Sequence, residues 1–187
     1  MYMNKSMVYL AIFFVLIASF LPAQSTDNPA LKPIIGNFSP RNFAEGEITR
    51  AELNLIVQAA VRTPSAGNRQ PWHFTVVQSQ DLVRRIIPQA TRGNILVIVS
   101  ASVATNTAVI LDCALATQSI YLAAQALGLG SRIYTGSINT INTNFKTELG
   151  LTGEAIALIR IGRLPPDVDA TSSASPRNET GRMVTYK

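Results

Sequence analysis

Residues Thr63–Phe74 read TPSAGNRQPWHF, and here the chain changes from a helical pattern to a strand pattern. Pro64 ends the helical pattern because its nitrogen carries no proton and its ring clashes with the preceding turn. Pro71 is followed by aromatic and β-branched residues that are typical of a strand. A serine, two side-chain amides and an arginine lie between the two prolines. The stretch therefore predicts a polar loop that either holds a ligand or satisfies its own backbone.

The segments around this loop alternate between helical and strand patterns. Thr49 and Glu52 have the spacing of a capping box, which predicts a helix that starts after Thr49 and stops at Pro64. Residues 26–47 look irregular. Further along we expect strands over 72–78, 94–101, 131–135 and 154–162, and helices over 79–87, 108–127 and 139–149. The run 94–101 is apolar throughout, as in a strand buried on both faces. The alternation predicts an α+β fold with layered helices and strands.

The helix expected over 108–127 is apolar around most of its circumference. The chain has 187 residues, of which 47% are hydrophobic, and this is enough for one domain with a core. So small a monomer cannot cover such a helix completely, and we therefore expect a homodimer. Asp112, Gln118 and Gln125 argue against a membrane span, and we expect Asp112 to anchor the helix.

Residues 1–25 have the layout of a secretory signal peptide. Lys5 precedes an apolar run over 7–21 that is short for a membrane span, and small residues offer cleavage after Ser25. We expect an exported protein, periplasmic or secreted, whose single domain occupies residues 26–187. An uncleaved anchor formed by 7–21 is the alternative, and only then do we expect contact with a membrane.

Charge and cysteine use narrow the functional classes. The formal charge is +5, and removal of Lys5 with the signal leaves +4. The basic residues form no block and do not alternate with aromatic residues, so a small anionic ligand is favoured over nucleic acid. Cys113 is the only cysteine and lies in an apolar helical pattern, which predicts a buried side chain rather than a nucleophile. The single histidine, His73, lies within an expected strand and is interpreted as structural. No catalytic side chain or metal cluster is expected.

The stretch TPSAGNRQPWHF resembles the (A/T)-P-S-x-x-N-x-Q-P-W-x-F block of the FMN-dependent nitroreductase family. A second block, LDCALATQSIYLAAQALGLGS at 111–131, is similar to the central helix of that family. TGSI at 135–138 and AIALIRIG at 155–162 follow in family order. The resemblance covers about residues 37–187. It implies a central mixed sheet flanked by helices, and a homodimer that holds FMN at the subunit interface.

The resemblance also implies which residues meet the ring of the flavin. They belong to the loop along the ring and ribityl chain, and to a turn whose backbone approaches the flavin N5. In this chain they are Pro64, Ser65, Asn68 and Gln70 in the loop, and Thr135 and Gly136 in the turn. Side-chain amides suit the alternating donors and acceptors of the ring edge.

A further group is implied at the phosphate and the pyrimidine edge. Ser39 and Arg41 match the last positions of an R-x-S-x-(R/K) stretch, while Asn37 stands where the family has its leading arginine. Arg177 matches a basic residue that returns to the phosphate, with Arg163 and Arg182 as weaker candidates. Guanidinium groups suit a phosphate dianion, and a cation at Arg41 beside the flavin N1 would raise the reduction potential.

The activity implied is ping-pong hydride transfer. NADH or NADPH reduces FMN and leaves, and a nitroaromatic, a quinone or a similar small acceptor then takes the hydride. Two alternatives stay open. One is a degenerate, non-catalytic member that binds flavin or another anion, which Asn37 and the short 89–93 segment favour. The other is a flavin oxidase or dehalogenase that acts on a specific metabolite.

Overall fold

Four strands form one sheet in the computed structural model, which describes residues 28–172 and 176–187. The order across the sheet is β1 (Trp72–Val77), β2 (Ile95–Ala101), β4 (Glu154–Gly162) and β3 (Gly130–Tyr134). The α+β class is confirmed, but the expected mixed sheet is corrected, because all three pairings among the described residues are antiparallel. β2 and β3 run in the same direction, yet β4 inserts between them and opposes both.

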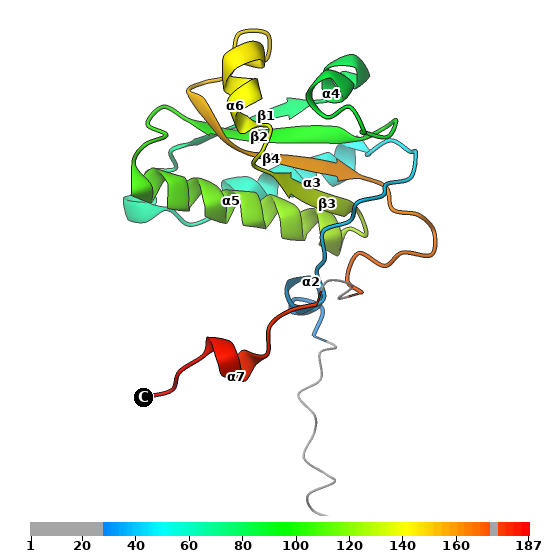
Figure 1. The fold of residues 1–187 in the computed structure, drawn as a ribbon, viewed down its shortest axis with the longest axis vertical. Helices are drawn as coiled ribbons and strands as arrows, with labels where there is room; N and C mark the ends of the chain where they lie inside the picture. Colours follow the sequence, from blue (N-terminus) through cyan, green and yellow to red (C-terminus); the bar gives the residue numbers. More distant parts are fainter. Residues whose placement is uncertain (1–27, 173–175) are drawn as a thin grey trace, which may run out of the picture.

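Helices cover both faces of this sheet (Figure 1). α3 (Arg50–Val61) and α5 (Thr107–Ala126) pack on one face and against each other. The other face carries α4 (Gln80–Ile86) and the segment of α6 (Ile138–Thr140) and η2 (Ile141–Phe145). β2 is buried along its whole length, as predicted, because each face of the strand contributes to a separate apolar core.

α3 begins where its capping box predicts. The Thr49 hydroxyl accepts the backbone N–H of Glu52 at 3.2 Å, and the Glu52 carboxylate accepts the N–H of Thr49 at 2.8 Å. Leu53, Ile56 and Ala60 then lie on one buried face. The helical geometry ends at Val61, three residues before Pro64. The local signals in the sequence therefore determine both ends of this helix.

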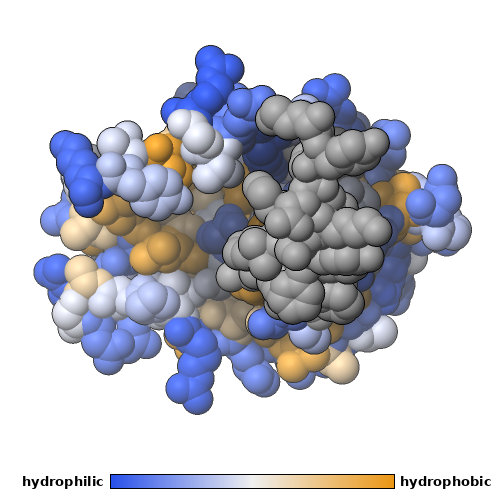
Figure 2. Space-filling view, turned by 90° about the horizontal axis from the view of Figure 1, so that it is seen from below, coloured by the Kyte–Doolittle hydropathy of each residue, from blue (hydrophilic) through white to orange (hydrophobic). Residues whose placement is uncertain are grey.

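α5 is the longest helix in the part of the chain that the structure describes, and its first turn is capped by the side chain of Asn106, which accepts the N–H of Ala108 at 2.9 Å. Among the described residues it is the one helix long and apolar enough to cross a membrane, and its packing on α3 and the sheet accounts for part of that composition. One of its faces stays uncovered, where Leu111 and Leu115 are 59% and 48% exposed. Figure 2 views the molecule from below Figure 1 and shows apolar side chains gathered among hydrophilic ones.

Three segments differ from the expected pattern. The helix expected over 139–149 is replaced by the three residues of α6 and a π-helical turn, η2. The side chain of Asn142 binds the backbone N–H of Ala155 at 2.8 Å and competes with regular helix geometry. Short helices also form at α2 (Lys32–Ile35), within a stretch expected to be irregular, and at α7 (Thr180–Met183). The predicted signal peptide, residues 1–25, lies outside the described residues.

Candidate functional site

The polar loop, residues 63–71, lies against α5 between Asp112 and Ser119. The carboxylate of Asp112 accepts the backbone N–H of Ala66 at 3.0 Å, and the hydroxyl of Thr63 donates to that of Ser119 at 2.8 Å. Asp112 is only 6% exposed. The expected anchoring role of Asp112 therefore takes a specific form, because this side chain joins the helix to the polar loop.

Hydrogen bonds within the polar loop hold an unusual backbone. Gly67, Asn68 and Gln70 have φ of 59°, 52° and 47°, in the left-handed region that non-glycine residues rarely adopt. The Ser65 hydroxyl accepts the N–H of Gln70 at 2.9 Å, and the Gln70 amide donates to the Asn68 side-chain oxygen at 3.3 Å. The interpretation that the loop satisfies its own backbone is therefore partly right.

The same loop still presents polar groups to solvent. Pro64, Asn68 and Gln70 are exposed and Ser65 is half-buried. Among the described residues, no group accepts the Ser65 hydroxyl proton, and neither the Asn68 side-chain NH₂ nor the Gln70 side-chain oxygen has a partner. The loop is thus held by hydrogen bonds and offers a hydroxyl and two amide groups to a ligand.

Thr135 and Gly136 follow β3 and lead into α6. Both are exposed, and a Cβ atom at Gly136 would meet nothing within 4 Å, so the backbone of this turn is open to a ligand. β3 ends toward the end of the sheet at which β1 begins, since Tyr134 pairs with Leu158 and Trp72 pairs with Ala101. The turn and the polar loop therefore lie toward the same end of the sheet, but at opposite edges.

Ser39 and Arg41 lie at the other end of α5. The carbonyl of the preceding Phe38 accepts the side-chain amide of Gln125 at 2.7 Å. Gln125 follows Asp112 by 13 residues, which is about 20 Å along a helix. Both predicted residues are exposed. Within one chain, the structure does not bring Ser39 and Arg41 to the polar loop.

Asn37 has a structural role at this end. Its amide donates to the carbonyl of Ile34 at 2.5 Å, and its oxygen accepts the hydroxyl of Tyr121 at 3.5 Å. Burial raises the pKa of Tyr121, while a hydrogen bond with Gln125 and the charge of Arg177 act in the opposite direction. Arg177 is therefore electrostatically coupled to this end of the molecule, where Ser39 and Arg41 also lie.

The weaker arginine candidates fit less well. Arg163 forms a bidentate ion pair with Glu52, at 2.7 and 2.8 Å, and also donates to the carbonyl of Glu47. Its guanidinium thus joins β4 to α3 and is not available to a ligand. Arg182 is exposed on α7.

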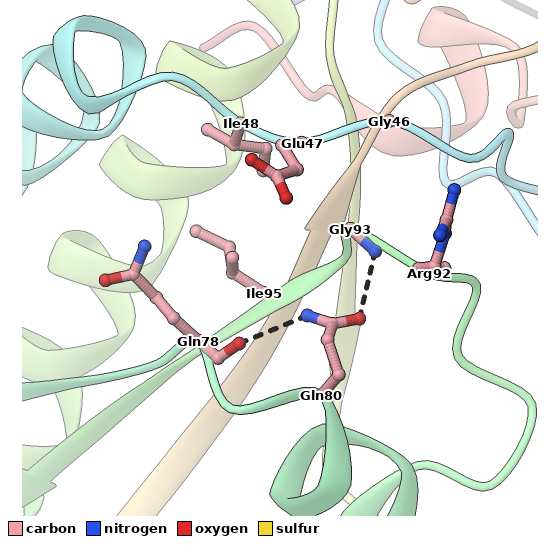
Figure 3. A pocket seen from close by; sticks show the side chains of 8 residues that line it. All are labelled: Gly46, Glu47, Ile48, Gln78, Gln80, Arg92, Gly93 and Ile95. Atoms are coloured by element: carbon pink, nitrogen blue, oxygen red, sulfur yellow. Dashed lines mark hydrogen bonds between the residues drawn. The ribbon is translucent and has the colours of Figure 1, made fainter.

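A pocket of about 400 Å³ lies at the other end of β1 and β2, away from the polar loop (Figure 3). Gln80 forms one side of it, donating to the carbonyl of Gln78 at 3.1 Å and accepting the N–H of Gly93 at 2.9 Å. Arg92, at its rim, is paired with Glu45 at 3.3 Å. None of the predicted site residues lines this pocket. The short 89–93 segment contributes Arg92 and Gly93 to its wall.

Sequence reasoning missed one residue near Ser39 and Arg41. Arg132, in β3, donates to the carbonyl of Pro40 at 3.4 Å. The sequence did show an arginine within the short strand expected at 131–135. Strand periodicity alone, however, does not say which segment of the chain lies beside that arginine.

These elements define an α+β fold with polar groups at both ends of a long central helix, and sequence comparison gives the family. The profile of the Nitroreductase family matches residues 36–96 and 89–163, more than half of the chain. The chain belongs to the nitroreductase family.

Particular relatives support this assignment. A protein of Archaeoglobus fulgidus provisionally named NADH dehydrogenase/NAD(P)H nitroreductase is 35% identical over 111 residues, covering 54% of this chain and 64% of its own. A protein of the same name from Methanothermobacter thermautotrophicus is 31% identical over 107 residues, covering 52% of this chain and 56% of its own. The matched region thus spans less than two thirds of either relative.

The fold is also that of a solved structure. A provisionally named nitroreductase in complex with FMN, from Desulfovibrio desulfuricans, superposes with a TM-score of 0.71 at 24% identity. The match covers 87% of this chain and 98% of the other. At this level of identity the likeness establishes the fold.

Proposed function

We propose that this chain is an FMN-dependent NAD(P)H oxidoreductase that works by ping-pong hydride transfer to a nitroaromatic, a quinone or a similar small acceptor. When bound, FMN would supply the hydride chemistry, which explains why no catalytic acid–base pair is needed. The family, the NAD(P)H-based names of the curated relatives and the FMN in the Desulfovibrio desulfuricans structure support the proposal.

The chemistry of the exposed donors fits this cofactor. The single observation that carries the proposal is the polar loop, which is held by Asp112 and by its own hydrogen bonds and still presents the groups of Ser65, Asn68 and Gln70. Such fixed amides and hydroxyls suit a planar ring with donors and acceptors on its edge. Arg41 has no side-chain hydrogen bond or ion pair among the described residues, so its guanidinium is available to an anion.

We further propose a homodimer with the flavin at its subunit interface. The two halves of the candidate site lie about 20 Å apart along α5, estimated from the helical rise between the contacts of Asp112 and Gln125. A two-fold axis that packs two copies of α5 antiparallel would place the polar loop of one chain beside Ser39 and Arg41 of its partner. The uncovered apolar face of α5, with Leu111 and Leu115, supports such packing.

The test of the proposed function is flavin retention followed by reduction. Purified protein is mixed with FMN, separated from free flavin by gel filtration and examined by visible spectroscopy and light scattering. We expect a yellow dimer that NADH or NADPH bleaches under anaerobic conditions. Gln70→Ala and Arg41→Ala should retain less FMN than the control Gln89→Ala, which changes an exposed glutamine outside the candidate site. A colourless protein with no flavin absorbance contradicts the proposal.

The alternatives predict other results. A non-catalytic member would retain FMN that neither NADH nor NADPH bleaches, and the structural use of Asn37 favours it. A flavin oxidase or dehalogenase would be bleached by a specific metabolite, which a substrate screen detects.

We also propose export through the segment 1–25, with membrane attachment only if it stays uncleaved. Cell fractionation and N-terminal sequencing test this. Mature protein that begins after Ser25 outside the cytoplasm is the expected result, and full-length protein in the cytoplasm contradicts it.

A further inference from the structure

The segment of Ser39 and Arg41 lies beside two arginines that come from the sheet. Arg132 of β3 and Arg160 of β4 are directly paired across the strands, so both side chains project from the same face. Arg132 donates to the carbonyl of Pro40, the residue between Ser39 and Arg41. Three arginines therefore belong to one small region, because Arg160 also packs on the ring of Phe43, two residues after Arg41.

No carboxylate in the part of the chain that the structure describes contacts any of these three groups. Arg160 is 1% exposed and is held by neutral partners: the Asn94 oxygen at 2.7 Å, the Thr91 hydroxyl at 3.3 Å, and the ring of Phe43 at 4.1 Å. Three acids of this end are already paired with other cations. These pairs are Glu45 with Arg92, Glu52 with Arg163, and Asp169 with Lys32.

Arg132 is the one of the two sheet arginines that can reach a ligand. It is half-buried, its guanidinium lies 5.4 Å from the ring centre of Tyr134, and its bond to Pro40 is 3.4 Å long. Charge-assisted bonds are normally near 2.8 Å, so this contact holds the guanidinium only weakly. Like charges directly opposite across strands are also unfavourable, which favours an anion at this position.

We propose that Arg132 binds the phosphate of the flavin together with Ser39, in place of the arginine absent at position 37. This inference rests on the proposed function. Asn37 cannot take that role, because both ends of its amide are engaged by Ile34 and Tyr121. Arg132 thus carries FMN affinity through the phosphate, and contributes little to binding of the ring.

Riboflavin lacks the phosphate and separates these contributions. The affinities of wild type, Arg132→Gln and Arg132→Lys for FMN and for riboflavin are measured by quenching of flavin fluorescence. For Arg132→Gln we expect FMN affinity to fall about tenfold or more, riboflavin affinity to change less than about twofold, and the lysine variant to lie between. Arg84→Gln, an exposed arginine on α4, removes the same charge elsewhere and should leave the ratio of the two affinities unchanged.

Equal weakening of both flavins would show that Arg132 only clamps the 39–41 segment, and unchanged affinities for both flavins would show that it does not meet the phosphate. If wild type binds neither flavin, thermal unfolding in the presence of inorganic phosphate tests the anion site by itself. If wild type binds neither flavin but phosphate stabilises it and not Arg132→Gln, the anion site stands and the flavin assignment fails. If phosphate has no effect either, both are overturned.

Discussion

The ion pair of Glu52 and Arg163 allows a prediction of how stability depends on pH. The two side chains are 20% and 32% exposed and join the start of α3 to the end of β4. The hydrogen bond from Arg163 is the largest cause that lowers the pKa of Glu52, from 4.5 to about 2. Because each pKa unit corresponds to about 1.4 kcal/mol, the shift corresponds to roughly 3 kcal/mol, which solvent screening reduces. We expect the charged pair to contribute about 2 kcal/mol near neutral pH.

Glu52→Gln removes the charge and keeps an acceptor for the backbone N–H of Thr49. The folded-state pKa lies below the unfolded value, so the stabilisation is present above about pH 4.5 and is lost as the pH falls toward about 2. Urea unfolding can be followed by the fluorescence of Trp72, the only tryptophan. The variant should be about 2 kcal/mol less stable at neutral pH and nearly equal to wild type near pH 2.

Glu148→Gln is the matched control, because it removes the more exposed ion pair with Arg85 and should cost less. A difference below about 0.5 kcal/mol between Glu52→Gln and wild type at neutral pH would refute the reasoning, because surface changes alone reach that size. A difference in stability between Glu52→Gln and wild type that persists unchanged near pH 2 would also refute it, because such a difference could not come from the charge of Glu52.

Three further predictions concern the backbone, the polar loop and the thiol. Gly93→Ala should lower the free energy of unfolding in urea by about 2 kcal/mol or more, because φ is +90° and the new Cβ would lie 2.3 Å from the Gly46 carbonyl oxygen. The control Gly128→Ala also has a positive φ but meets no neighbouring atom, and it should cost about 1 kcal/mol. Asp112→Ala should speed hydrogen exchange in the polar loop and weaken flavin binding, and unchanged exchange would remove it as the anchor. Burial raises the pKa of Cys113 to about 11, so about 0.1% is thiolate near pH 8, and a thiol reagent should react only after unfolding.

Local signals predicted the elements well where a cap or breaker was near. The capping box of Thr49 and Glu52 and the stop before Pro64 were confirmed, as was the burial of β2 on both faces. α2 was missed although Pro33 stands in its first turn, because four residues give too little periodicity. The helix expected over 139–149 was wrong in its geometry, because the bonds between Asn142 and β4 depend on tertiary structure.

The candidate site was less accessible to sequence reasoning because its contacts join distant segments. Ser65, Asn68 and Gln70 could be named from a local motif. That Asp112 fixes the loop, and that Arg132 lies beside Pro40, required the packing of α5 and β3. Their separations in the chain, 46 and 92 residues, lie beyond any local pattern.

Two features raise the free energy of the folded single chain. Arg132 and Arg160 face each other without an acid among the described residues, and Leu111 and Leu115 leave apolar surface in water. The proposed flavin and the proposed second copy each relieve one of them, since phosphate offsets the charge and helix packing covers the surface. The flavin and the second copy would also bring the polar loop together with Arg41. Within one chain these two parts of the site lie at different positions along α5 and stay apart. Flavin binding and dimer formation should therefore stabilise one another, because each completes what the other needs.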